Sequence, residues 1–563
     1  MVTMTASPQL RNLADRYWEA RLEASPLFAT FLGDHRYDDR VDDLSASSEA
    51  AQRVLWEIFL DEARAIDPAT LDETDRVTQR LLTGELDDAI TAIDARLVEL
   101  TSDQMQGIHA DLLITAGQLS APAPNHAAMA VVRVQRLGTM LDQAAERFRA
   151  GLAAGRTPAR TNIIRSLHQV DGYLASPIEQ DPFVMMAGPE GWDGEAAWRG
   201  ELATAVTQHL RPAYVRYRAT LADELLPIAR PDEQAGLHWL ADGPDLYRTL
   251  IQLHTGLALS AEELHEIGRH EVLEVLPAQY REVGKRQFGT DDLAEIFDHL
   301  LNDEDLRYNN ADEILAHAQQ CLDAATAAMG QWFGILPQAP CTLTPIPDYL
   351  AADAPAAYYT PPAPDGSRPG EYHVNLHEPR TKGRAETASI AFHEAIPGHH
   401  LQLAIAAERT DLPAFRRLSW GHTAYVEGWA LYTERLADEM GLYETDLDRL
   451  GMLAADSWRA CRLVVDTGLH AMGWSRQQAI DFMVLHAPVS RDEIITEIDR
   501  YIGMPGQALA YKVGQREILR LRTMAQERLG DRFTLPDFHD VVLGGATVSL
   551  AVLAERVEAW ADS

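Results

Sequence analysis

The spacing of apolar residues constrains the fold of this 563-residue chain more than any other feature. Through most of the first 230 positions, apolar residues recur about every 3.6 residues, as in LRNLADRYWEARLEASPLFATFLG. Helical patterns resume after residue 236 and again after residue 380. The sequence therefore predicts a mainly α protein with a large multi-helix body.

A proline-rich segment at residues 340–378 interrupts this pattern. It contains the alternating run YHVNL and the turn sequence DGSRPG, which are typical of short strands. We expect a small sheet or hairpin here, directly before the next helix. Tyr358 and Tyr359, with the turn at residues 365–368, are candidates for lining a substrate site, although an ordinary hairpin explains them equally well.

The length exceeds that of most single domains, yet no low-complexity stretch divides the chain. The loop ARPDEQ at residues 229–234 is the candidate boundary. We expect an N-terminal helical lobe at residues 1–235 and a C-terminal helical lobe with the catalytic site at residues 236–563, both within one continuous structural unit.

Charge and cysteine content limit the partners and the compartment. The formal net charge of -36 repels nucleic-acid phosphates and anionic lipid headgroups, so neither nucleic acid nor membrane is an expected partner. Three scattered cysteines, no basic and apolar leader pattern, and no run of about 18 apolar residues favour the cytoplasm. We expect a monomer or homodimer there.

The segment AFHEAIPGHHLQ is the strongest candidate for chemistry. His393 and Glu394 are adjacent, as in the HExxH motif in which two histidines bind zinc and the glutamate activates water. The next histidines, His399 and His400, are too far along an undistorted helix to share a metal with His393. Pro397 lacks an N–H and Gly398 tolerates unusual dihedral angles, so we expect a break that returns one of them to the metal.

A third ligand is expected on a later helix. Glu427, in AYVEGWALYTE, is the candidate, and Glu434 lies seven residues further on the same helical face. Glu434 is better placed to hydrogen-bond a ligand or to act as an alternative ligand. His400 is the other candidate for such a supporting role, and the choice between His399 and His400 as ligand stays open.

A His–Glu pair by itself is weak, because such pairs are common on solvated helices. The chain contains a second one, His265–Glu266, within an ordinary amphipathic helical pattern. We expect that pair to be surface structure. The cluster at residues 393–400 differs, because its surroundings are apolar and a proline–glycine pair interrupts it.

Four blocks, HEAIPGHHLQ, EGWALYTE, RLVVDTGLHAMGWS and PGQALAYKVGQREI, resemble the bacterial family known as domain of unknown function 885. That family is similar to gluzincin zinc metallopeptidases, whose helical lobes surround a deep channel. The resemblance implies a zincin-like body, one zinc per chain with His393, His399 and Glu427 as ligands, and Glu394 as the base. The two inserted residues before Gly398 depart from the better-known peptidases.

Other residues are assigned by chemistry alone. Tyr511 is the leading candidate to stabilise an oxyanion, with Tyr501 and His470 behind it. Lys512 and Arg462 could anchor a substrate carboxylate. Each has a structural alternative, since buried tyrosines usually belong to the core.

These observations predict a zinc hydrolase, most simply a peptidase that acts on short peptides. An amide or ester hydrolase of a non-peptide metabolite fits the same metal and base. A non-catalytic metal-binding protein is the third alternative, and the presence of Glu394 argues against it. Two imidazoles and a carboxylate suit zinc best, with manganese or cobalt as substitutes.

Overall fold

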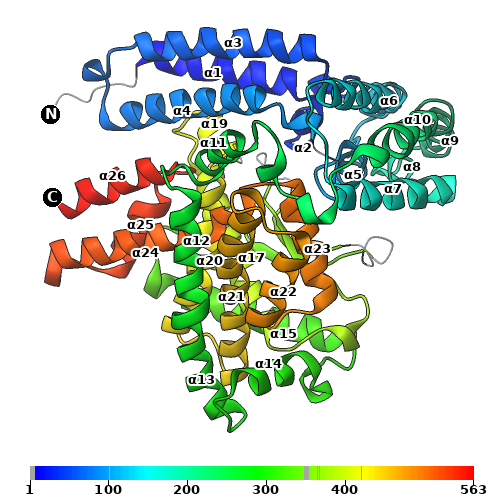
Figure 1. Ribbon diagram of the computed structural model, residues 1–563. Helices are drawn as coiled ribbons and strands as arrows, with labels where there is room; N and C mark the ends of the chain where they lie inside the picture. Colours follow the sequence, from blue (N-terminus) through cyan, green and yellow to red (C-terminus); the bar gives the residue numbers. More distant parts are fainter. Residues whose placement is uncertain are drawn as a thin grey trace. The chain divides into compact units, whose positions relative to one another are not determined.

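The computed structural model describes residues 7–100, 102–347, 351, 354–363, 366, 368–419 and 421–563. In these ranges the chain is mainly helical with one small sheet, which confirms the predicted fold class at this level (Figure 1). None of the helices described is long and apolar enough to cross a membrane.

The chain forms two compact units. Unit 1 comprises Met1–Thr249, Leu469–Gln477 and Thr496–Pro505, and unit 2 comprises the remainder. The predicted boundary after residue 235 therefore falls inside unit 1. Unit 1 also takes two segments from the C-terminal half of the chain, which no local sequence pattern indicates.

The described residues of unit 1 form helices and connecting segments, with isolated bridges but no strand. Its helices are α1 (Pro8–Ala24), α2 (Pro26–Phe31), α3 (Ala46–Ala65), α4 (Glu73–Ala95), α5 (Ile108–Ala116), α6 (Pro124–Ala153), α7 (Arg160–Ala175), α8 (Pro182–Met185), α9 (Glu195–Ala205) and α10 (Arg211–Ala219). Helices α1, α3 and α4 pack on one another, and α6 packs on α9 and α10 (Figure 1). The core of unit 1 follows the predicted helical spacing, with Val134, Leu137 and Leu141 of α6 fully buried.

Unit 2 holds most of the predicted site residues. Its helices are α12 (Ala261–His270), α13 (Leu276–Gln287), α14 (Leu293–Asn302), α15 (Ala311–Trp332), α17 (Glu386–Glu394), α18 (His399–Glu408), α19 (Ala414–Leu418), α20 (Thr423–Glu439), α24 (Ala510–Leu529), α25 (Leu535–Leu543) and α26 (Leu550–Ala561). Four further helices contain residues of both units: α11 (Gly243–Thr255), α21 (Asp446–His470), α22 (Arg476–His486) and α23 (Arg491–Gly503).

The predicted strands form a three-stranded sheet before α17. They are β1 (Cys341–Pro345), β2 (Ala357–Thr360) and β3 (Gly370–Val374), in the order β1-β3-β2. β3 pairs antiparallel with β2 and parallel with β1. The expected small β element is thus confirmed, whereas Asp365 and Ser367 of its predicted turn lie outside the described residues.

Helices α20 and α24 touch through their backbones, and no other pair of described elements packs so extensively. A Cβ atom on Gly428 of α20 would overlap the backbone of Gly514 in α24. A Cβ atom on Gly514 would overlap the backbone oxygen of Ala424. Glycine at both positions is therefore required by close approach, and it fixes the position of α20 in unit 2.

A buried ionic cluster joins the same two helices to α21. Lys512 Nζ of α24 lies 2.5 Å from Asp456 Oδ1, and Arg435 Nε of α20 lies 2.8 Å from Asp456 Oδ2. Burial alone would raise the pKa of Asp456, but the charges of Lys512 and Arg435 outweigh it and hold the pKa well below its usual range. The three side chains therefore depend on one another.

We expect Gly514→Ala to destabilise unit 2, because the added methyl group forces α24 away from α20. The loss should be about 1–3 kcal/mol, measured as a lowered midpoint of urea or thermal unfolding. Gly330→Ala in α15 is the matched control, because its Cβ would meet nothing within 4 Å, and it should leave stability unchanged or slightly raised. Equal effects of the two changes would contradict the backbone contact.

Asp456→Asn should lower the free energy of unfolding by about 3 kcal/mol at pH 7, because it removes the carboxylate nearest to Lys512 and Arg435 and leaves Lys512 with the more distant Glu271, at 3.7 Å. The folded-state pKa of Asp456 is depressed, so its contribution is present above about pH 4 and is lost at lower pH. The difference between wild type and variant in urea unfolding should therefore shrink as the pH falls below about 4. Asp245→Asn, which removes an exposed pair with Arg248, should change little.

Candidate metal centre

The helix that carries His393 breaks before the next histidine. α17 ends at Glu394 and α18 begins at His399, as the sequence predicts. Ala395 (φ −100°, ψ −105°) and Gly398 (φ −78°, ψ −127°) leave the helical region, and the Ile396–Pro397 peptide bond is cis. The break changes the chain direction between the two candidate ligands.

Gly398 makes this break possible by close packing. A Cβ atom at this position would overlap the backbone oxygen of His393. The break is also anchored from α20, because the indole Nε1 of Trp429 donates a hydrogen bond of 3.0 Å to the backbone oxygen of Pro397. The helix that carries Glu427 therefore also fixes the chain between the two histidines.

Three of the predicted ligands meet at this point. His393 Nε2 lies 3.6 Å and His399 Nε2 lies 3.5 Å from Glu427 Oε2, and the two imidazole rings are nearly perpendicular at 86°. One donor atom from each residue lies within 4.8 Å of the others. The side chains are 6%, 12% and 19% exposed, respectively. Two imidazoles and one carboxylate are a ligand set that zinc uses in sites with an open position.

Glu434 orients His393 from behind. Its Oε1 lies 2.8 Å from His393 Nδ1, so Nε2 of that ring is directed to Glu427. Glu434 is buried two turns beyond Glu427 on α20, and Tyr443 donates a hydrogen bond to its backbone oxygen. This carboxylate–imidazole hydrogen bond is the contact predicted for Glu434, and such a contact is usual behind a histidine ligand. That His393 binds a metal stays a prediction.

The electrostatics couple these groups closely. Burial lowers the pKa of His393, but hydrogen bonds to Glu427 and Glu434 outweigh it and raise the pKa to about 9. Burial would raise the pKa of Glu427, but its bonds to His393 and His399 hold it well below the usual range. Burial raises the pKa of Glu394 despite the nearby charges of His393 and His399.

His400 and the two tyrosines of β2 make contacts other than those among His393, His399 and Glu427. His400 Nδ1 is 2.9 Å from the Tyr359 hydroxyl, and Nε2 is 3.1 Å from the backbone oxygen of Ala339. Both ring nitrogens thus bind the sheet region, which corrects the supporting role predicted for His400 beside the metal. The Tyr359 hydroxyl makes this bond, and the Tyr358 ring stacks on His373. A contact of either tyrosine with substrate stays a prediction.

The residues proposed to bind substrate divide into two groups. The guanidinium carbon of buried Arg462 lies 4.4 Å from the ring centroid of Tyr511, so these two side chains are in direct contact. Lys512 is instead 3% exposed and pairs with Asp456, which satisfies its charge inside unit 2. That position corrects the prediction that Lys512 anchors a substrate carboxylate.

His470 and Tyr501 belong to unit 1. His470 is fully buried, accepts a hydrogen bond from the backbone nitrogen of Leu237 at Nδ1, and donates one from Nε2 to the backbone oxygen of Tyr501. Burial lowers its pKa to about 3. Tyr501 is 1% exposed and its hydroxyl bonds to Glu497. Neither ring nitrogen of His470 is left for the predicted oxyanion contact, so its role is structural.

Sequence reasoning missed Arg459 and misjudged His265. The positive charge of Arg459 on α21 lowers the pKa of Glu394, against the larger effect of burial. Its spacing from Arg462, three residues in an apolar helix, was the available signal. His265 is buried and bonds to Thr467 Oγ1 at 2.9 Å, so the expectation of a solvated position was wrong for it.

Comparisons with known proteins place the whole chain in a family. No curated protein matches it. A crystal structure described as that of "the putative lipoprotein from Colwellia psychrerythraea" is similar over 100% of both chains, with 28% identity and a TM-score of 0.91. A structure described as "a putative lipoprotein of unknown function from Shewanella oneidensis" shares the fold, with 17% identity, a TM-score of 0.74, and coverage of 98% of this chain and 99% of that one. The model of the family described as "Bacterial protein of unknown function (DUF885)" matches residues 26–557, and the chain therefore belongs to the DUF885 family.

Proposed function

We propose that this chain is a zinc-dependent hydrolase that cleaves short peptides. The observation that carries the proposal is the meeting of His393, His399 and Glu427 from three different helices beside Glu394. His399 faces Glu427 with Nε2, its buried Nδ1 has no hydrogen-bond partner among the described residues, and the donor set suits zinc. When bound, zinc lowers the pKa of water towards neutrality and polarises a carbonyl group.

The residues around the cluster supply the remaining steps. The carboxylate of Glu394 accepts a proton from the attacking water and passes it to the leaving amine nitrogen. Glu434 holds the His393 ring in one orientation throughout, through the bond at Nδ1. Tyr511, supported by Arg462 over its ring, is the candidate to donate a hydrogen bond to the oxyanion.

Cleavage of peptides, rather than of another carbonyl compound, rests on the resemblance to gluzincin peptidases. A zincin-like body with a deep channel, and the peptide substrate, are parts of this proposal. A panel of short peptides with free and blocked termini tests it. Activity confined to non-peptide amides or esters would indicate that the protein hydrolyses a metabolite. Metal binding without turnover of any substrate would indicate a metal-binding protein that is not an enzyme.

The proposed location is the cytoplasm. Cys321 and Cys461 are buried free thiols, as expected in a reducing compartment. The two solved relatives are described as lipoproteins, which is a statement about those proteins. Fractionation of the cells that produce the protein, with an antibody against this chain, distinguishes the cytoplasm from the membrane fraction in which a lipoprotein is found.

Protein purified without added metal should contain one tightly held zinc per chain in elemental analysis. We expect His393→Ala, His399→Ala and Glu427→Ala each to lose it, because each removes one of three ligands. His400→Ala is the matched control and should keep the zinc, since that ring binds Tyr359 and Ala339. Loss of zinc in the His400 variant alone would reverse the assignment of the second histidine.

Glu394→Gln should reduce kcat by about 10²–10⁴ while the zinc content stays unchanged, because it removes the base and none of the ligands. The natural control is Glu266→Gln, which alters the other His–Glu pair at an exposed position. That variant should retain full activity. Undiminished hydrolysis by Glu394→Gln would exclude the proposed proton transfer.

A further inference from the structure

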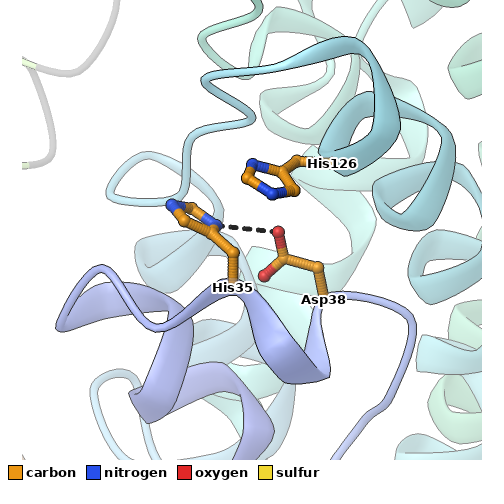
Figure 2. Close-up of side chains that lie close together, drawn as sticks. All are labelled: His35, Asp38 and His126. Carbon is orange, nitrogen blue, oxygen red and sulfur yellow. Dashed lines mark hydrogen bonds and ion pairs between the residues drawn. The ribbon is translucent and has the colours of Figure 1, made fainter.

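A second group of potential ligands lies in unit 1, where nothing in the proposed function uses it. It consists of His35 and Asp38, at the two ends of a short 3-10 turn (His35–Tyr37 and the residue after it), and His126 in the first turn of α6 (Figure 2). One donor atom from each of the three lies within 4.8 Å of the others. We propose that these three residues bind a divalent transition-metal cation. Zinc is the cation used to test this.

The Asp38 carboxylate presents one of its oxygens to the imidazoles. Asp38 is 2% exposed, and its Oδ1 accepts a hydrogen bond of 2.6 Å from the Thr30 hydroxyl and lies 3.6 Å from Arg133 Nη2. Its Oδ2 faces the imidazoles and lies 2.8 Å from His35 Nδ1 (Figure 2). Such outer contacts fix a ligating carboxylate without occupying its metal-binding oxygen.

Arg133 approaches Asp38 at Oδ1, the oxygen that does not bond to His35. Its guanidinium donates to the backbone oxygens of Arg40 and Tyr37, at 2.9 and 2.8 Å, and so holds the loop that carries Asp38. Its positive charge is thereby shared among several acceptors on the Oδ1 side of the carboxylate.

The imidazole of His126 supplies the second observation. Its Nδ1 is buried and has no hydrogen-bond partner in the part of the chain that the structure describes, which is unfavourable for a polar atom inside a protein. Its ring stacks on that of His35 with centroids 4.4 Å apart and an angle of 13°. The terminal ring torsion of histidine is broad, so the proposal requires only a rotation of these rings to direct one nitrogen of each to the cation.

The donor set decides the class of cation. Two imidazoles with one carboxylate oxygen suit zinc, cobalt or nickel, whereas calcium and magnesium require mainly oxygen ligands. Donor atoms around tetrahedral zinc are about 3.3 Å apart. Here His35 Nδ1 and Asp38 Oδ2 are 2.8 Å apart, and one donor atom from each of the three residues lies within 4.8 Å of the others. A bound cation would link the turn after α2 to α6, two parts of unit 1 that are distant in sequence.

The test uses the full-length His393→Ala/His399→Ala protein, which lacks the site in unit 2. Titration with zinc, followed by calorimetry and by elemental analysis after dialysis, should give one equivalent bound at micromolar zinc. Adding His126→Ala, or Asp38→Asn, should reduce this to none. Adding His168→Ala, which changes an exposed histidine of the same unit, should leave one equivalent.

Circular dichroism of every variant checks that unit 1 is folded, and Asp38→Asn preserves side-chain shape if a histidine change unfolds it. No saturable binding in the double variant, or binding that survives both His126→Ala and Asp38→Asn, would overturn the proposal and leave an ordinary ion pair with a stacked ring. Because the double variant removes the first site, this result is independent of whether the protein is a hydrolase.

Discussion

The contact between α20 and α24 is the constraint on which the rest of unit 2 depends. Gly428 and Gly514 let the two backbones touch, and Asp456 joins both helices to α21 through Arg435 and Lys512. Glu427, the residue before Gly428, is therefore held by backbone packing rather than by a flexible loop. A metal ligand needs such support, because coordination fails when donor atoms shift by a few tenths of an ångström.

The break between α17 and α18 depends on the position of α20, which that contact fixes. Gly398 allows the chain to turn against the carbonyl of His393, while Trp429 on α20 binds the carbonyl of Pro397. α20 thus supplies a carboxylate to the cluster, a second carboxylate behind His393, and an anchor for the break. Helix α20 therefore contacts His393 on α17, His399 on α18 and Pro397 between them.

Several histidines and one lysine that the sequence suggested as site residues instead stabilise the fold. His470 holds two backbone groups, His400 joins α18 to the sheet region, and Lys512 neutralises a buried carboxylate. A buried polar group destabilises the fold unless it is hydrogen-bonded or paired, so many buried polar side chains make contacts that only stabilise the structure. A residue type alone cannot separate these roles from ligation, because the same imidazole nitrogen serves either purpose.

The sequence by itself determined the helical class, the small sheet before α17 and the break after Glu394, because these follow from local spacing and from the backbone limits of proline and glycine. It also indicated His393, Glu427 and either His399 or His400 as candidate ligands, with Glu434 behind them. Only the tertiary structure separated His399 from His400, gave Lys512 and His470 their partners, and brought His35, Asp38 and His126 together. Those outcomes depend on hydrogen bonds and packing between residues distant in the chain, which no local pattern encodes.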